Sequence, residues 1–493
     1  MKLGGWVKHF LVYGIGVVLM QVLPALMIPI YTHRVSPEIY GVLELLNRSQ
    51  DILLLIFSFG LRSALLTFYQ MRNDQPAEQK RIYGTAIQFL CGFGFVAIGL
   101  MMIGARMWSR ILFATPTYSA AVVLILVGTY FETVFQMSVL YLQSEVKSVL
   151  YVSIFTSRAV VAVILNLLFV YWWRWGLMGI LWATVLHTAG FAIGVTIYMF
   201  RRTGFGFDRK LLTEMLWFGA PVMIGAFSSF ILNNGDRYFL NHYRTEAEVG
   251  LYGLGYKVGA LSMSLVLMPF LKIWSVTMVD MSKKPDGPSV LGRVGTYLLV
   301  ACTFSTLGFS LLGPYAIRFC SDRAYWSAYH VIPIVGAAYI FYSWTIVMDA
   351  SFYVTKRTVY KIYTISIAGA FVTLLYWLLI PRYGMMGAAW ATLGGYACFA
   401  GVTALYAQRV YFIHYQLGRL AAMGALGLLF YKLGALIPIT PVITGLVLRS
   451  LITLAFPVAL WVGGFLTHDE RRAIGEYWEA IRLRYLGHGS VNA

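Results

Sequence analysis

The chain has 493 residues, of which 59% are hydrophobic and only 12% are charged, and its mean hydropathy is +0.72. Soluble domains carry about 25% charged residues, so this composition excludes a soluble domain and predicts membrane-spanning helices of roughly 20 apolar residues. The net charge of +18 does not indicate a nucleic-acid partner, because the cations are spread over many short loops.

The apolar runs, taken in chain order, predict about fourteen transmembrane helices. They lie near 8–31, 39–69, 82–105, 117–140, 148–171, 176–200, 212–239, 248–279, 290–314, 326–353, 358–381, 384–409, 416–436 and 442–466. The first run follows Lys2 and Lys8 as a signal sequence would. Its length, its two prolines and the lack of a small-residue cleavage site predict that it is retained. The segments between the runs are too short for a catalytic domain, so no enzyme is expected.

The two halves of the chain repeat each other. Residues 175–184 read WGLMGILWAT, and residues 383–392, which lie 208 positions later, read YGMMGAAWAT. Gly41 and Gly250 keep nearly the same spacing. Six helices per copy is an even number, so the second copy enters the membrane from the same side, and the copies should be related by an axis along the membrane normal. Duplicated transporters place their substrate site between the copies, near the bilayer midplane.

The repeat predicts an all-α polytopic membrane protein made of two six-helix lobes and two accessory helices. The expected parts are an N-lobe over 1–200, a cytoplasmic linker over 201–211, a C-lobe over 212–409, accessory helices over 410–466 and an amphipathic cytoplasmic tail over 467–493. The tail is assigned because Ile474, Trp478, Ile481 and Tyr485 recur at helical spacing among arginines, which is typical of a helix in the headgroup zone.

The basic residues predict the orientation. With both termini in the cytoplasm, 22 basic residues face the cytoplasm and nine face the opposite side, as the positive-inside rule requires. The nine are Arg34, Arg106, Arg110, Arg174, Arg237, Arg244, Arg318, Arg323 and Arg382.

This orientation can be tested with reporter fusions. Fusions at Lys210 and at Gly487 are both expected to report a cytoplasmic location, because both positions follow an even number of predicted spans. A periplasmic signal from either fusion would require an odd number of spans before that point.

Charged residues inside the predicted spans are the chemically informative ones, since an ionised group at mid-bilayer needs a partner or a wet cavity. The helix at 39–69 carries four of them on one face: Glu44, Arg48, Asp51 and Arg62. The helix at 248–279 carries Lys257 and Lys272, which lie 209 and 210 positions after Arg48 and Arg62. Pro269 predicts a bend between these two lysines.

Two interpretations of these charges remain open. Arg48 can simply pair with Glu44 or Asp51 inside a packed bundle. That interpretation accounts poorly for Lys257 and Lys272, which have no acidic residue within one turn of their own helix. An anionic substrate in a central cavity accounts for both lysines.

Other membrane charges are secondary candidates. Arg158 is a further candidate for substrate binding. For Arg449, a contact with a lipid headgroup reached by snorkelling is as good an interpretation as substrate binding. Glu132 and Asp349 are candidates for binding a coupling proton or cation, and a hydrogen-bonded structural carboxylate is an equally good interpretation of each.

Motifs for other chemistry are missing from the sequence. It contains no Walker A loop, no His-Glu-x-x-His and no nucleophile elbow. The four cysteines, Cys91, Cys302, Cys320 and Cys398, lack paired metal spacing. No cofactor and no metal site is therefore expected.

Two segments carry a family resemblance. Residues 28–41, IPIYTHRVSPEIYG, and residues 234–240, NGDRYFL, with 249–252, VGLY, resemble the signatures of the polysaccharide flippases of the multidrug, oligosaccharidyl-lipid and polysaccharide exporter superfamily. The resemblance implies two lobes in a V, alternating access, and export of undecaprenyl-pyrophosphate-linked oligosaccharides across a bacterial inner membrane. It also implies that the cations on the second and eighth helices contact the pyrophosphate: Arg48, Arg62, Lys257 and Lys272. The lipid II flippase of this superfamily has paired cavity arginines in its first helix. The first helix here has none before Arg34, which argues against lipid II.

The expected function is therefore a flippase for a lipid-linked oligosaccharide used in surface polysaccharides such as lipopolysaccharide O-antigen or exopolysaccharide. The expected partners are that substrate and the bilayer, with a polysaccharide polymerase or export complex as a further candidate and no nucleic acid. One alternative is a cation-coupled multidrug or organic-solute exporter of the same fold, which would need a small acidic cavity. Another is a membrane-embedded glycosyltransferase or polymerase, which would need a large polar loop with clustered Asp, Glu or His.

An ion gradient is the expected energy source, since no nucleotide site is visible. Arg48 would keep Glu44 and Asp51 ionised until an arriving diphosphate displaced it. Glu44 or Asp51 is therefore the favoured carrier of a coupling proton, ahead of Glu132 and Asp349.

Overall fold

The computed structural model describes residues 27–72, 74–145 and 147–465, and these ranges contain helices and no strand. The elements are α2 (Met27–Arg34), α3 (Pro37–Ser58), α4 (Leu61–Met71), α5 (Pro76–Ile103), α6 (Ala105–Phe113), α7 (Ser119–Ser144), α8 (Ser148–Asn166), η1 (Leu167–Trp172), α9 (Gly176–Thr203), α10 (Arg209–Tyr243), α11 (Glu246–Ser282), α12 (Gly287–Cys320), η2 (Arg323–Val331), α13 (Ile332–Met348), α14 (Ala350–Val354), α15 (Val359–Val410), α16 (Leu417–Leu436) and α17 (Val442–Val462).

The predicted all-α membrane fold is confirmed. Among the described residues, eleven helices are long and apolar enough to cross a membrane, and α3 and α4 together make a twelfth span that is bent by 43°. The predicted total of fourteen is not confirmed. The first predicted helix, 8–31, lies mostly outside the described residues, as does the predicted tail at 467–493, and the spans predicted at 358–381 and 384–409 form the single element α15.

The backbone of α15 breaks where the sequence predicts a boundary between two spans. Gly384 has φ 55° and ψ −134°, which is not helical. Gly176, its equivalent in the repeat, also has φ 55° and begins α9. A straight helix of 52 residues would be about 78 Å long, more than twice the hydrocarbon thickness of about 30 Å. The carboxylate of Glu248 accepts a hydrogen bond from the amide of Met385 at 3.0 Å, so it caps the helix that follows the break.

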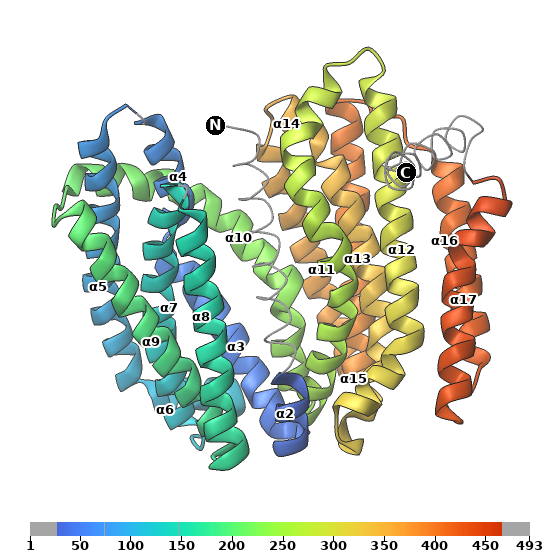
Figure 1. Cartoon of the computed structure of the whole chain (residues 1–493), viewed down its shortest axis with the longest axis horizontal. Helices are drawn as coiled ribbons and strands as arrows, with labels where there is room; N and C mark the ends of the chain where they lie inside the picture. The colour runs from blue at the N-terminus through green and yellow to red at the C-terminus, as the bar shows by residue number, and fades with distance from the viewer. Residues whose placement is uncertain (1–26, 73, 146, 466–493) are drawn as a thin grey trace, which may run out of the picture.

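The helices form two groups with two diagonal helices between them (Figure 1). The N-group comprises α4 to α9, and the C-group comprises α11 to α15; α3 and α10 run obliquely between the groups, and α16 and α17 stand beside α12. The groups approach each other at the end that carries α2 and separate toward the end that carries α4 and α14 (Figure 1).

The end that carries α2, where the two groups approach each other, is called the closed end below. Here α3 crosses α11 at Gly41 and Gly250, which are equivalent positions of the repeat. A Cβ atom on Gly41 would overlap the carbonyl oxygen of Glu246, and a Cβ atom on Gly250 would overlap that of Pro37. Pro37 and Glu246 are also 209 positions apart. The contact is thus reciprocal, as in an interface between two copies related by a two-fold axis.

Hydrogen bonds between the two halves reinforce the closed end. The Tyr325 hydroxyl donates to the carbonyl of Val35 at 2.9 Å, and the Thr32 hydroxyl donates to the carbonyl of Cys320 at 2.9 Å. Both bonds would break if this end opened.

At the other end, α10 connects the groups. The break between α3 and α4 falls at Gly60, which is 209 positions before Pro269 and so is its equivalent in the repeat. The backbone of Gly60 touches that of Gly219 in α10. The part of α10 farther along the chain packs on α15. α11 continues as a helix through Pro269. The connection from α9 to α10 is residues 204–208. Asp208 caps α10, and the hydrogen bond from the Leu211 amide, followed by the charge of Arg81, holds the pKa of Asp208 below its usual range.

Candidate functional site

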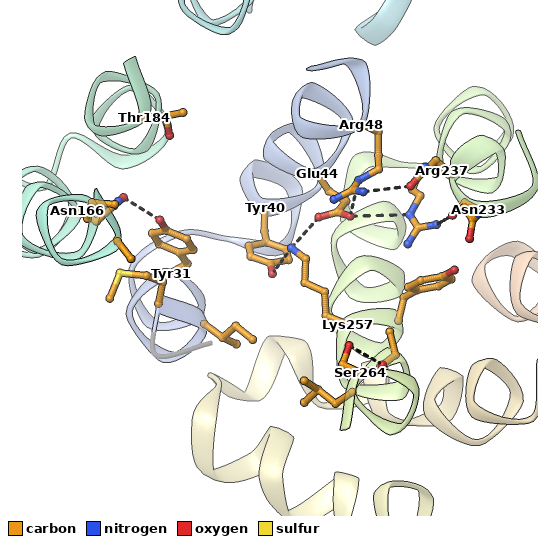
Figure 2. Close-up of a pocket in the computed structure, with 18 of the residues that line it drawn as sticks. Tyr31, Tyr40, Glu44, Arg48, Asn166, Thr184, Asn233, Arg237, Lys257 and Ser264 are labelled. Atoms are coloured by element: carbon orange, nitrogen blue, oxygen red, sulfur yellow. Dashed lines mark hydrogen bonds and ion pairs between the residues drawn. The ribbon is translucent and has the colours of Figure 1, made fainter. Parts of the chain in front are cut away.

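A cavity of about 750 Å³ lies between the two halves of the protein, lined by residues from α2, α3, α8 and α9 on one side and from α10, α11 and α13 on the other (Figure 2). Its polar and charged lining residues are Tyr31, Tyr40, Glu44, Arg48, Asn166, Thr184, His187, Asn233, Asn234, Arg237, Tyr256, Lys257, Ser264 and Tyr339. A site between the two copies is what the repeat predicts.

Glu44 is the electrostatic centre of this cavity. Its side chain is only 1% exposed, and three cations surround it. Lys257 Nζ lies 2.8 Å from Oε2, while Arg48 Nε and Arg237 Nε lie 3.3 Å and 3.8 Å from Oε1 (Figure 2). A carboxylate this deeply buried stays ionised only with such partners. One carboxylate therefore holds together three helices: α3, α10 and α11.

Arg48 forms ion pairs with both acidic residues of its own helix that the sequence offers as partners. Besides Glu44, it contacts Asp51 Oδ2 at 2.7 Å, and it also donates to the side-chain oxygen of Asn234 in α10 at 3.1 Å. A quarter of its side chain remains exposed. The packed-pair interpretation thus describes the contacts of Arg48, while the guanidinium still lines the cavity.

Lys257 has a counter-ion, contrary to the argument from sequence. Its ammonium pairs with Glu44 from α3 and donates to the Tyr40 hydroxyl at 3.0 Å. The partner comes from α3, which crosses α11, so no acidic residue within one turn of Lys257 on its own helix indicates it. With 37% of its side chain exposed, Lys257 still presents charge to the cavity.

The lining carries more positive than negative charge. Arg48, Arg237 and Lys257 line the cavity with one carboxylate, Glu44, while Asp51 and Asp236 pair with these cations but do not line it. A dianionic group entering the cavity would meet the exposed parts of Arg48 and Lys257 first.

Arg237 is the cavity residue that sequence reasoning missed. It was expected on the periplasmic side, but its side chain is 2% exposed within α10, so it does not count toward the charge bias. Its Nη1 lies 2.7 Å from Asp236, and its guanidinium stacks 3.9 Å from the Tyr256 ring. Asp236 also accepts from the Tyr252 hydroxyl at 2.5 Å. In the sequence, the adjacent Asp236 and Arg237 near the end of a predicted span were the feature that could have indicated a buried ion pair.

Removing Arg237 should destabilise the protein. Arg237→Leu is expected to lower the free energy of unfolding by about 3–5 kcal/mol, because it leaves Asp236 buried without its cation. Thermal and denaturant unfolding in detergent micelles would measure this. The matched control is Arg357→Leu, at an exposed position, which should unfold like the wild type. Equal stability of the two variants would contradict a structural role for the Arg237 network.

The remaining predicted binding cations lie away from the cavity lining. Arg62 and Lys272 are exposed, and neither lines the cavity. Arg158 forms a short ion pair with Glu132, and its Nε lies 3.4 Å from the ring of His187. His187 does line the cavity, so Arg158 and Glu132 reach it only through that ring.

Asp349 belongs to a separate ion pair. Its carboxylate, which is 4% exposed, lies 2.9 Å from Lys361 Nζ in α15, and neither residue lines the cavity. No cluster of three or more potential metal ligands occurs in the part of the chain that the structure describes.

Comparison with known proteins finds a matching family model and solved structures with a similar fold. The family model described as "Polysaccharide biosynthesis protein" matches residues 6–273, and no curated protein sequence matches significantly. Among solved structures, the lipid II flippase MurJ in an inward closed conformation matches with a TM-score of 0.74 and 13% identity, covering 93% of this chain and 99% of that one.

Two transporters of the MOP superfamily are also similar. An inward-facing MATE-family multidrug transporter matches with a TM-score of 0.65 and 13% identity, covering 79% of this chain and 94% of its own. A MOP-superfamily transporter from Pyrococcus furiosus has a TM-score of 0.55 and 12% identity, covering 82% and 95% of the two chains. At these identities the likeness establishes the fold, and the proteins that share it are a flippase and transporters, not enzymes.

Proposed function

Since this chain belongs to the polysaccharide biosynthesis protein family, we propose that it flips an undecaprenyl-diphosphate-linked oligosaccharide across a bacterial inner membrane for surface polysaccharide assembly. The observation that carries the proposal is the cavity between the two halves, where Arg48 and Lys257, equivalent positions of the repeat, both face the space. In this proposal both termini are cytoplasmic.

The cavity chemistry suits a diphosphate joined to sugars. The Arg48 guanidinium can grip phosphate oxygens with two parallel hydrogen bonds, while Lys257 supplies a compact point charge. Around them lie amides, hydroxyls and aromatic rings that match sugar hydroxyls and ring faces: Tyr31, Asn166, Thr184, Asn233, Tyr256 and Ser264. The cations Arg48 and Lys257 are partly exposed to the cavity while the carboxylate Glu44 is buried, which does not suit the cationic drugs of the alternative exporter function.

The arrangement of the helices fits one state of an alternating-access cycle. With the connection at 204–208 in the cytoplasm, the closed end with the Gly41 and Gly250 crossing faces the periplasm. Release of substrate to that side would require α3 and α11 to separate at this crossing.

The experiment that tests this function uses a deletion strain. Loss of the gene should cause a lipid-linked oligosaccharide to accumulate in the cytoplasmic leaflet, and purified protein in vesicles should flip that lipid. If the strain accumulated no lipid-linked glycan but lost resistance to organic cations, the exporter alternative would replace the proposal. The identity of the accumulated lipid would give the class of surface polysaccharide.

We also propose that Glu44 or Asp51 carries a coupling proton. A diphosphate bound to Arg48 and Lys257 competes with both carboxylates for these cations, and each carboxylate that loses its partner can then bind a proton. Glu132 and Asp349 are less favoured, because each keeps its own cation outside the cavity lining.

This coupling predicts a loss of gradient dependence. Flipping in vesicles by the double variant Glu44→Gln and Asp51→Asn should no longer respond to a proton gradient, whereas Glu132→Gln and Asp349→Asn should respond like the wild type. An unchanged response of the double variant would exclude this pair of carboxylates.

A further inference from the structure

A second pocket, of about 420 Å³, lies where the accessory helices α16 and α17 meet α12 and η2. It shares no lining residue with the central cavity. Its lining includes Ser310, Leu311, His330, Tyr431, Ala435 and Arg449. The pocket therefore combines apolar surface with one permanently charged side chain.

Arg449 is buried in this pocket, not extended to the membrane surface by snorkelling as one interpretation of the sequence held. Only 5% of it is exposed. Its Nη1 donates to the carbonyl of Leu311 at 3.1 Å and its Nη2 to the carbonyl of Ile437 at 2.6 Å. These neutral acceptors fix the guanidinium but do not balance its charge. No carboxylate within the described residues forms an ion pair with it.

One buried donor of the pocket lining lacks an acceptor, and a second such donor lies beside the pocket. Arg449 Nε has no hydrogen-bond partner, and neither does the hydroxyl of Tyr315, whose ring lies 5.5 Å from the guanidinium carbon. A guanidinium N–H only donates, and a phenol lacking any partner has an O–H to donate. The group that would satisfy the pocket is therefore an acceptor, and the uncompensated charge of Arg449 requires it to be an anion.

The position of the pocket indicates a lipid source for that anion. α16 and α17 both have the length and composition of membrane spans, so the 437–441 connection between them lies at a membrane surface, with Pro438 and Ile439 in the pocket wall. Arg449 is seven residues into α17, which is about 10 Å below that surface and within reach of a phosphate at the headgroup level. Leu446, which is exposed and lies one turn before Arg449 on the same face of α17, extends apolar surface from the pocket for an acyl chain.

We propose that this pocket binds the phosphate of an anionic glycerophospholipid, held by Arg449, and that the lipid fastens the accessory helices to α12. The site is independent of substrate flipping, because it is separate from the central cavity. The charge on the lipid matters, since a zwitterionic headgroup would bring its own cation to the guanidinium.

The test compares the thermal unfolding of the delipidated full chain with phosphatidylglycerol and with phosphatidylcholine of identical acyl chains. Wild-type Tm should rise more with phosphatidylglycerol, and native mass spectrometry should show that lipid retained. Arg449→Gln should lose this preference. Ala435→Phe should also lose it, because it fills the pocket while keeping the arginine. Lys432→Gln, which removes an exposed cation of α16, should keep it.

Three outcomes would overturn the proposal. The wild type could respond equally to both lipids, or Ala435→Phe could keep the full preference. Undecaprenyl diphosphate could bind in an Arg449-dependent manner and displace phosphatidylglycerol, which would assign the pocket to the substrate lipid. If Arg449→Gln does not fold, Arg449→Lys and Ala435→Phe test the proposal in its place. Arg449→Lys keeps the charge, so it should keep part of the preference for phosphatidylglycerol.

Discussion

Arg48→Ala and Lys257→Ala are each expected to abolish surface glycan while protein level and membrane insertion stay normal. Each variant removes one charged contact to the diphosphate. Since such a contact contributes about 1.5–3 kcal/mol, flipping should fall by roughly 10- to 150-fold per residue. Glu44 keeps two of its three cations in either variant, so the fold should survive. Glycan export in cells and flipping in vesicles measure the effect.

The repeat provides matched controls for this prediction. Arg62 and Lys272 lie on the same two spans, are also related by the repeat, and are exposed outside the cavity lining. The resemblance implies that they contact the pyrophosphate together with Arg48 and Lys257, whereas we propose that only Arg48 and Lys257, which line the cavity, bind it. Arg62→Ala and Lys272→Ala should therefore export glycan normally, and Arg48→Lys should keep partial activity because it retains a point charge. Normal export by the Arg48→Ala and Lys257→Ala double variant would show that these two cations do not bind the substrate.

Gly41→Ala should shift the protein away from the state seen here. The added methyl group would overlap the backbone carbonyl of Glu246, and backbone cannot move aside as a flexible side chain can. Overpacking of this kind costs about 1–3 kcal/mol, which corresponds to a shift of roughly 5- to 150-fold in the population of the closed state. Gly250→Ala should act in the same way, because the contact is reciprocal.

Cross-linking at the closed end measures that shift. A Thr32→Cys variant that keeps native Cys320 and lacks the other three cysteines can be bridged by a short bifunctional thiol reagent, since the Thr32 hydroxyl reaches the Cys320 carbonyl. Gly41→Ala should reduce the yield of this cross-link. The control Gly99→Ala, where an added Cβ would meet nothing within 4 Å, should leave it unchanged. An undiminished yield in Gly41→Ala would show that the crossing is not the closing contact.

The sequence predicted what depends on periodicity and repetition. Hydropathy predicted the all-α membrane fold but not a confirmed number of spans. The duplicated WGLMGILWAT pattern made Gly176 and Gly384 equivalent positions, and both have φ 55°. Gly41 and Gly250, which are aligned by the repeat in the sequence, are in contact in the structure, because equivalent helices of the two copies meet near the axis that relates them.

The sequence could not supply contacts between helices. Lys257 looked uncompensated because Glu44 belongs to another span, and only the crossing of α3 and α11 brings the two together. Hydropathy places the end of a helix only within a few residues, so Arg237, near the end of the predicted span 212–239, counts among the periplasmic cations in the sequence. The protein instead buries this arginine against Asp236 and Tyr256. For Arg449, periodicity does not distinguish a lipid-facing side chain from one that donates to the carbonyls of neighbouring helices.

Binding of undecaprenyl diphosphate to the purified protein is the decisive measurement, because it depends on the cavity and not on the other proteins of the pathway. The wild type should bind this lipid, and Arg48→Ala and Lys257→Ala should each weaken binding by roughly tenfold or more. Arg62→Ala and Lys272→Ala should bind it like the wild type. Equal affinity of all four variants and the wild type would contradict the assignment of the diphosphate to Arg48 and Lys257.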